Sequence, residues 1–332
     1  MTTADRSPVQ FQTVARGLSP TTRVCTRPLT EKDSAVLLAI GQYRYLDTDH
    51  VADLFVQSRR KAQLRLRDLL WRGLIHRWPI EQRQASPLTP PVYALTTSGA
   101  RHIAKLREQD PRPVCERARR AREQNYHMRH DLEANRFFTK LAAGASNLPE
   151  QGLYHWLGEA TCHAAYERDG SPPSDGWGRY LLSDREITFD LEWDRGSEHA
   201  RRIRAKANGY LTYFRGRRHA DLHHVLFVAP TRVREGELHD LISPVLPPNV
   251  NLCRFWTTAV ETVSAIGQLG AVWLEISGPP HRFAFADMPG FPRGRLLAMD
   301  SIAKPGWWKR RPGGGEVASR LWVDDVDARG LR

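Results

Sequence analysis

Apolar residues recur with a helical period through most of residues 29–107. The pattern predicts three successive helices, the first of which ends where Gly41 interrupts it. Two runs of β-prone residues, 74–78 and 92–96, then predict a hairpin with a Pro-rich tip, and a further helix starts at Ser98. The residues expected to cap the three helices are Thr30 for the first, Thr48 or Asp49 for the second, and Ser58 for the third.

This order of elements is that of a winged helix-turn-helix, whose third helix enters the major groove, so we predict a DNA-binding domain over residues 29–107. Lys61, Arg65 and Arg72 are expected to point outward, opposite the apolar face of that helix. The apolar face consists of Ala62, Leu66, Leu69, Leu70 and Leu74. The expected DNA-binding residues are Arg59, Arg60, Lys61, Arg65, Arg67 and Arg72. The alternative is an ordinary three-helix core with a solvated basic face.

The pattern changes after a charged, Pro-containing stretch over residues 108–122, which is expected to be a basic linker. A long amphipathic helix follows, and short apolar runs then alternate with helical stretches, as in an α/β sheet domain, here over 123–303. Residues 1–28 have no hydrophobic period and are expected to form a mobile arm; residues 304–332 are expected to be a basic, disordered tail. The predicted fold class of the whole chain is α+β.

One predicted strand, over residues 187–194, carries an unusual number of acids. Its sequence ITFDLEWD alternates strictly, so its apolar and acidic residues point to opposite faces of the sheet. The apolar face consists of Ile187, Phe189, Leu191 and Trp193, and the acidic face of Asp190, Glu192 and Asp194. Residues two apart lie about 6.7 Å apart along a strand, which lets neighbouring carboxylates converge on one cation.

A divalent metal site is the chemistry that this acidic face favours. Asp175 precedes the strand by one hairpin and would supply a further oxygen, so the predicted Mg²⁺ ligands are Asp175, Glu192 and Asp194. Carboxylates so close together raise one another's pKa unless a metal or a cation neutralises them, and Arg195 and Lys206 are the candidate cations. The alternative is a solvent-facing acidic strand with no bound metal.

Composition narrows the class of partner. The 332 residues contain 49 Lys and Arg against 37 Asp and Glu, a formal charge of +12 and a pI near 9.9, which attracts polyanions such as nucleic acid. The sequence has neither a run of about 20 apolar residues nor a signal peptide, so we expect a cytoplasmic protein with no membrane partner. The four cysteines form no CxxC pair, and phosphate-loop, dinucleotide-binding, GxSxG and HExxH motifs are absent from the sequence.

Several segments resemble the replication-relaxation family of actinobacterial and firmicute plasmids and integrative elements. After the start described above, these are NYHMRHDLEANRFF, PSDGWGRY, FDLEWDRGSE, KANGYLTYF and VLFVAP. The resemblance runs from about residue 29 to about residue 278. Its most specific part is the block E-x-D-R-G-[ST]-E, here Glu192 to Glu198, followed by K-x3-Y, here Lys206 and Tyr210.

The resemblance implies a winged helix joined to a domain like the PD-(D/E)xK restriction endonucleases, with a role in plasmid replication, relaxation or mobilisation. In an active nuclease the catalytic residues would be Asp175, Glu192, Asp194 and Lys206. Lys206 would replace the strand lysine of that motif, because Asp194 occupies its position. Two alternatives are open: a Mg²⁺-dependent DNA endonuclease, and a non-enzymatic replication or transfer factor. The expected partners are double-stranded DNA, a second copy in a homodimer, and other plasmid replication or transfer proteins.

Overall fold

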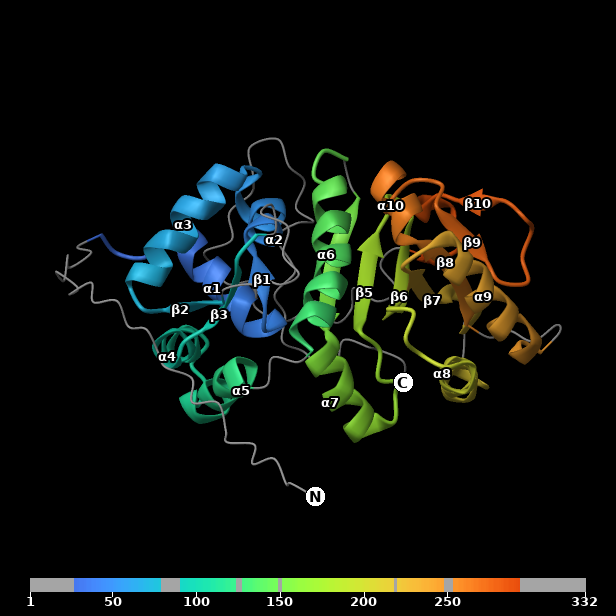
Figure 1. The fold of residues 1–332 in the computed structure, drawn as a ribbon, viewed down its shortest axis with the longest axis horizontal. Coiled ribbons are helices and arrows are strands. Elements are labelled where there is room, and N and C mark those ends of the chain that lie inside the picture. Colours follow the sequence, from blue (N-terminus) through green and yellow to red (C-terminus); the bar gives the residue numbers. More distant parts are fainter. Residues whose placement is uncertain are drawn as a thin grey trace, which may run out of the picture.

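The computed structural model describes most of the chain between residues 27 and 292 (Figure 1). The described ranges are 27–78, 90–123, 127–148, 151–217, 220–247 and 253–292. Nearly all of the predicted arm, the whole of the predicted tail and most of the Pro-rich hairpin tip lie outside these ranges. The described part combines a helical unit that carries a small sheet with an eight-stranded sheet flanked by helices, which confirms the predicted α+β class.

The N-terminal unit holds five α-helices and a three-stranded antiparallel sheet in the described ranges. Its elements are α1 (Glu31–Tyr43), β1 (Leu46–Asp47), α2 (Thr48–Val51), the π-helical turn η1 (Ala52–Val56), α3 (Arg59–Trp71), β2 (Ile75–Trp78), β3 (Val92–Leu95), α4 (Thr97–Leu106) and α5 (Pro111–Glu123). The strands pair in the order β1-β3-β2. The order of elements up to α4 agrees with the predicted one, with β1 as an added strand.

Helix capping follows the predicted chemistry at two of three positions. Thr30 caps α1 in a capping box, and the Ser58 hydroxyl accepts a hydrogen bond from the first turn of α3. The second helix is capped by Asp47 rather than by Thr48 or Asp49, because the Asp47 carboxylate reaches two backbone N–H groups at 2.9 Å each. The short helix therefore starts one residue earlier than a cap at Thr48 would allow.

Two predictions for the N-terminal unit are wrong. Helix α1 does not break at Gly41 but runs to Tyr43, and a side chain at position 41 would clash with Ile103 of α4. Gly41 thus permits close helix packing instead of ending a helix. The expected linker over 108–122 is largely the helix α5, since its apolar residues share one buried face and most of its charged residues are exposed. The buried face consists of Val114, Ala118 and Ala121.

The second unit is built on one mixed sheet of eight strands. Its elements are α6 (Met128–Gly144), β4 (Gly152–Gly158), α7 (Glu159–Asp169), β5 (Gly176–Leu181), β6 (Arg185–Trp193), α8 (Ala200–Phe214), η2 (Ala220–Leu222), β7 (His223–Ala229), α9 (Arg232–Ile242), η3 (Ser243–Val245), β8 (Arg254–Ala259), α10 (Val260–Ile266), β9 (Trp273–Glu275), β10 (Arg282–Phe283), η4 (Phe285–Asp287) and β11 (Phe291–Pro292). The strand order is β10-β9-β8-β7-β6-β5-β4, with β11 beside the start of β6. Strands β6, β7 and β8 are parallel, and the other neighbours are antiparallel.

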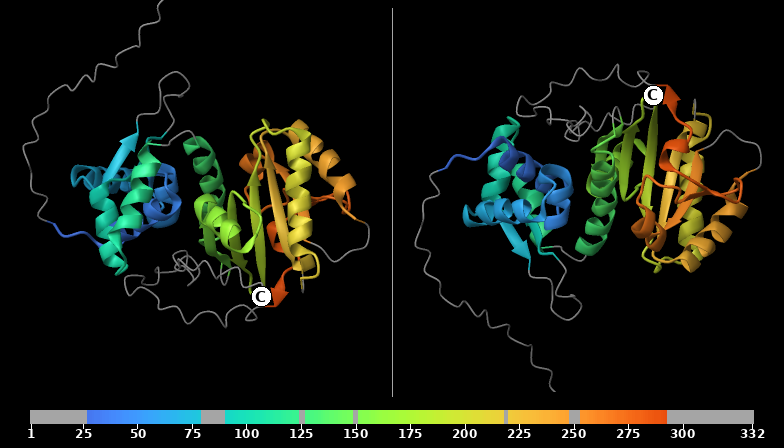
Figure 2. Two further views of the ribbon diagram at one scale, coloured as in Figure 1. Left: turned by 90° about the horizontal axis from the view of Figure 1, so that it is seen from below. Right: turned by 90° about the horizontal axis from the view of Figure 1, so that it is seen from above.

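The two units share one hydrophobic core. Helix α6 lies between the N-terminal unit and the sheet in every view (Figures 1 and 2). The ring of Tyr43 stacks on Trp156 of β4 with centroids 3.6 Å apart, and the core cluster continues without interruption from α1 to β9. The Asn135 amide on α6 donates to the backbone carbonyls of Tyr43 and Tyr45 at 3.1 and 3.0 Å. The N-terminal unit is therefore held against the sheet by buried contacts.

Gly99 in the first turn of α4 allows a close approach that no larger residue permits. A Cβ atom at Gly99 would collide with the backbone carbonyl of Leu74, which already accepts the Thr96 N–H at 3.1 Å. We expect Gly99→Ala to lower the free energy of unfolding by about 1–3 kcal/mol, measured by urea denaturation. Gly209→Ala on α8 is the control, because nothing lies near its Cβ position, and it should gain about 0.5–1 kcal/mol. Equal stability of the two variants would contradict this packing.

Candidate functional site

The acidic face of β6 lies inside the protein. Strand β6 alternates as predicted, with its apolar residues toward α6 and its acids on the opposite face. Asp190, Glu192 and Asp194 are all almost completely buried. The solvent-facing alternative is therefore wrong. A buried carboxylate must be paired or hydrogen-bonded, so the neighbours of each acid determine its chemistry.

Glu192 pairs with two residues of α8. The Lys206 ammonium lies 2.8 Å from Glu192 Oε2, and the Tyr210 hydroxyl donates to Oε1 at 2.6 Å. Burial raises the pKa of Glu192 to about 7 against the lowering effect of Lys206. Burial would lower the pKa of Lys206, but Glu192 and Asp175 together raise it above its ordinary value. The predicted proximity of Lys206 to the acidic strand is thus present.

Asp175 pairs with His130, which the sequence pattern did not predict near the acidic strand. His130 Nε2 in the first turn of α6 lies 2.8 Å from Asp175 Oδ1, and the Trp193 backbone N–H donates to Oδ2 at 2.7 Å. Burial would raise the pKa of Asp175, but hydrogen bonding and charge from His130 hold it below its ordinary value. Burial would lower the pKa of His130, but Asp175 raises it to about 9. The two residues therefore form an ion pair at neutral pH.

Asp194 is matched by an arginine of α9. Arg234 Nε donates to Asp194 Oδ2 at 2.6 Å, and the Gly196 N–H donates to Oδ1 at 2.9 Å. The Arg195 guanidinium points elsewhere and lies 3.9 Å from Glu133 of α6. Arg195 therefore does not neutralise the acidic strand as expected, and Arg234 does so instead.

These pairs leave little coordination capacity for Mg²⁺. Each of the six carboxylate oxygens of Asp175, Glu192 and Asp194 accepts a hydrogen bond or ion pair from a protein donor. Within the described ranges, no group of three or more His, Cys, Asp and Glu side chains is arranged to hold a metal ion. The arrangement therefore does not fit a metal shared by the three acids, and Mg²⁺ binding stays a prediction.

The fourth acid, Asp190, belongs to a separate buried cluster that the sequence argument missed. The Ser174 hydroxyl donates to Asp190 Oδ1 at 2.6 Å, and His223 Nε2 lies 2.9 Å from Oδ2. The other ring nitrogen of His223 lies 3.1 Å from the Thr188 hydroxyl. Ser174 is fully buried and bonds to the acid rather than to the histidine, so this cluster lacks the order of a nucleophilic triad. Its burial between β6 and β7 supports a structural role.

The predicted DNA-binding residues of α3 divide into two groups. Arg59, Arg60, Lys61 and Arg67 are exposed. Arg65 is only 20% exposed and pairs with Asp33, while Arg72 is 14% exposed and pairs with Asp68 at 2.9 Å. Lys61, Arg65 and Arg72 thus do not form one outward cluster. Arg65 joins α3 to Asp33 of α1, whereas the partner of Arg72, Asp68, belongs to α3 itself.

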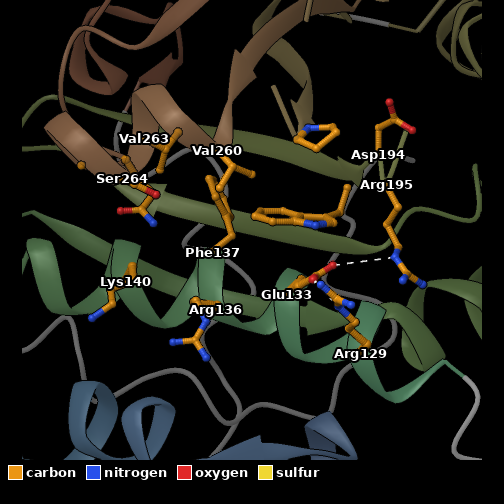
Figure 3. Close-up of a pocket in the computed structure, with 14 residues that line it drawn as sticks. Arg129, Glu133, Arg136, Phe137, Lys140, Asp194, Arg195, Val260, Val263 and Ser264 are labelled. Atoms are coloured by element: carbon orange, nitrogen blue, oxygen red, sulfur yellow. Dashed lines mark hydrogen bonds and ion pairs between the residues drawn. The ribbon is translucent and has the colours of Figure 1, made fainter. Parts of the chain in front are cut away.

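A pocket of about 670 Å³ lies where β6, β7 and β8 end (Figure 3). We call it the strand-end pocket. Its cationic residues are Arg129, Arg136 and Lys140 of α6 and Arg195 after β6. Its apolar residues include Phe137, Trp193, Val260 and Val263. Glu133 and Asp194, the latter a predicted metal ligand, also line it. Of the cationic and apolar residues only Arg195 was considered for a site from the sequence, as a cation for the acidic strand, because the lining comes from four separate segments.

The ion pair of His130 and Asp175 makes stability depend on pH. The folded pKa of His130, about 9, exceeds its ordinary value, so the stabilisation is full below about pH 6.5 and is lost as the pH rises through 9. We expect the free energy of unfolding of wild type to exceed that of His130→Gln. This difference should be larger at about pH 6 than at about pH 10 by on the order of 3 kcal/mol. Chemical denaturation of both proteins at the two pH values measures this difference. A constant difference would exclude the ion pair.

Comparison with known proteins identifies the family. Among the described helices, none has the length and apolar character needed to cross a bilayer. No curated protein and no solved structure shows a significant match to the chain. Residues 37–227, which include the whole of α3, the acidic strand, Lys206 and Tyr210, match the replication-relaxation family. The match covers more than half of the 332 residues, and the chain belongs to the replication-relaxation family.

Proposed function

We propose that the protein is a DNA-binding replication factor of a plasmid or integrative element, and that α3 of a winged helix-turn-helix contacts the duplex. The observation that carries this proposal is the exposed basic face of α3. Family membership supports the replication role. The net charge of +12 supports a polyanionic partner.

The exposed face of α3 combines charge with an aromatic ring. Arg60, Leu64, Arg67 and Trp71 recur at intervals of four, three and four residues and so share one side of the helix. Trp71 is 72% exposed, and the Arg67 guanidinium lies 5.5 Å from its ring centroid. An aromatic ring beneath a guanidinium restricts its orientation and displaces part of its bound water. Both effects favour contact with phosphates or base edges.

The opposite side of α3 anchors the helix. Ala62, Leu66 and Leu69 are fully buried. Arg65 donates to Asp33, whose carboxylate also accepts from Thr30 in the capping box of α1. The helix therefore cannot rotate without breaking a partly buried ion pair, and its cationic side keeps a fixed direction.

For the second unit we favour the non-enzymatic alternative. Asp175, Glu192 and Lys206 lie close together, as the resemblance to PD-(D/E)xK nucleases implies, and this supports a common ancestry of the sites. Each oxygen of these acids already accepts a hydrogen bond or ion pair from a protein donor, which supports a structural role. A homodimer and other replication or transfer proteins stay predictions as further partners.

The role of α3 is tested by neutralising Arg60 and Arg67 together. We expect Arg60→Gln/Arg67→Gln to weaken duplex DNA binding at least tenfold, because two phosphate contacts are lost. Each lost contact should also reduce the steepness of the plot of log K against log salt concentration by about 0.9. Fluorescence anisotropy over a salt series measures both quantities. Arg201→Gln/Arg204→Gln on exposed positions of α8 is the control with the same change of charge. An equal loss in the control pair would refute recognition by α3.

The role of the acidic strand is tested by Glu192→Gln. If the acid is structural, Lys206 loses its closest carboxylate partner, at 2.8 Å, and keeps the ion pair with Glu198 at 3.1 Å, so we expect a loss on the order of 2 kcal/mol. Mn²⁺ should leave the melting temperature of both proteins unchanged. The exposed Glu237→Gln is the carboxyl-to-amide control and should cost less than about 1 kcal/mol.

A metal-dependent nuclease requires the opposite result in the same calorimetric experiment. Wild type would then gain stability with Mn²⁺ as RT ln(1 + [L]/Kd), and Glu192→Gln would be as stable as wild type but insensitive to the metal. That outcome would replace the structural role with the enzymatic one.

A further inference from the structure

The strand-end pocket occupies the position where open α/β sheets bind ligands. Arg195 follows β6, Pro230 follows β7 and Val260 follows β8, and these three strands are parallel. Ligands of such sheets bind in the crevice beyond the carboxyl ends of the strands. Helix α6 closes the other side of the pocket (Figure 3). The volume of about 670 Å³ lies within the usual range of small-ligand sites.

One end of the pocket carries uncompensated positive charge. Arg129 Nε donates to Glu133 at 3.1 Å, and Arg195 lies 3.9 Å from the same carboxylate, as Figure 3 shows. One carboxylate neutralises one guanidinium, so the group of three keeps a net positive charge. Their side chains are 66% exposed for Arg129 and 43% for Arg195, so both guanidinium groups are accessible to an anion.

The wall of the pocket between these arginines and α10 is apolar. Trp193, at the end of β6, is half-buried, while Phe137 and Val263, which also line the pocket, are buried. A flat ring can pack on this aromatic and aliphatic surface while a phosphate joined to it binds the two guanidinium groups. A nucleotide unit has this composition.

A row of cations continues along α6 beyond the space that one nucleotide needs. Arg129, Arg136 and Lys140 recur at intervals of seven and four residues and span about 16 Å of helix. Arg136 and Lys140 pair with Asp47 and Asp53 of the N-terminal unit and still keep 38% and 45% of their side chains exposed. A row of this length suits successive phosphates of one strand better than a free nucleotide.

We propose that the strand-end pocket binds single-stranded DNA, with one phosphate between Arg129 and Arg195 and its base against Trp193. The inference rests on the proposed function, because it takes DNA as the polyanion. It adds a second contact on the face of the sheet opposite the pair of Glu192 and Lys206. Duplex binding by α3 and strand binding by the pocket use separate sets of residues.

The test is fluorescence anisotropy of a labelled oligothymidylate with full-length protein. We expect Arg129→Gln/Arg195→Gln to weaken binding about tenfold or more, and Arg201→Gln/Arg204→Gln, which makes the same change of charge on α8, to bind as wild type. Wild-type affinity in the pocket variant, or no binding by wild type, would overturn the proposal. Both arginines are exposed enough for the variant to fold, and its melting temperature verifies this.

Glu133→Gln provides a test with the opposite sign. Removing the carboxylate that Arg129 and Arg195 share raises the local positive charge, so strand affinity should increase several-fold. A structural role of these residues would lower affinity in both variants. An unchanged or weaker affinity of Glu133→Gln would therefore count against the proposal.

Two further measurements distinguish binding at the pocket from binding by α3, and a DNA strand from a free nucleotide as the ligand. Arg60→Gln/Arg67→Gln should lose duplex binding and keep oligothymidylate binding, so failure of the proposed function would not resemble failure of the pocket. Thymidine monophosphate should compete at least a hundredfold more weakly than the oligonucleotide, because it contacts only one end of the cationic row. Equal competition would overturn the assignment to a strand and leave a free nucleotide as the ligand.

Discussion

The central constraint on this fold is the burial of carboxylates on strand β6 and the adjacent Asp175. An uncompensated carboxylate costs several kcal/mol in the interior, so every such group must find a donor of its own. The donors come from different elements: His130 from α6, Lys206 from α8 and Arg234 from α9. Each of these three helices therefore has a polar contact that restricts its rotation and its shift along the strand, in addition to its apolar packing.

The junction between the two units also combines apolar packing with hydrogen bonds to buried polar groups. The ring stack of Tyr43 and Trp156 supplies apolar contact, and the Asn135 amide satisfies two carbonyls where α1 ends. Two ion pairs, Arg136 with Asp47 and Lys140 with Asp53, also join α6 to the N-terminal unit. Because the core is continuous, α3 has a defined direction relative to the sheet, which a linker between independent domains would not provide.

Local chemistry made part of this predictable from the sequence. The cap at Thr30, the buried face of Ala62 and Leu66, and the alternation of β6 depend on residues a few positions apart, which a sequence displays directly. Lys206 was placed near the acids because it lies on the helix that follows the strand. The expected groupings of Asp175, Glu192 and Asp194 and of the α3 cations were drawn from the same local patterns.

The remaining features depend on contacts between distant segments. Arg65 belongs to a helical face that is outward by periodicity, yet Asp33 of another helix draws it inward. His130 and Arg234 are separated from their acids by 45 and 40 residues along the chain, and no periodicity connects them. Residues 108–122 were predicted to be a linker because charged and Pro residues dominate their composition. The three small or apolar residues that α5 buries were too few to reveal a packed helix.

The position of Arg136 and Lys140 couples two regions of the molecule. The same two side chains border the strand-end pocket and hold Asp47 and Asp53 of the N-terminal unit. An anion that draws them into the pocket loosens the attachment of that unit, and the free energy of this competition acts equally in both directions. Under the two binding proposals above, occupancy of the pocket and the attachment of the N-terminal unit that carries α3 are therefore linked thermodynamically.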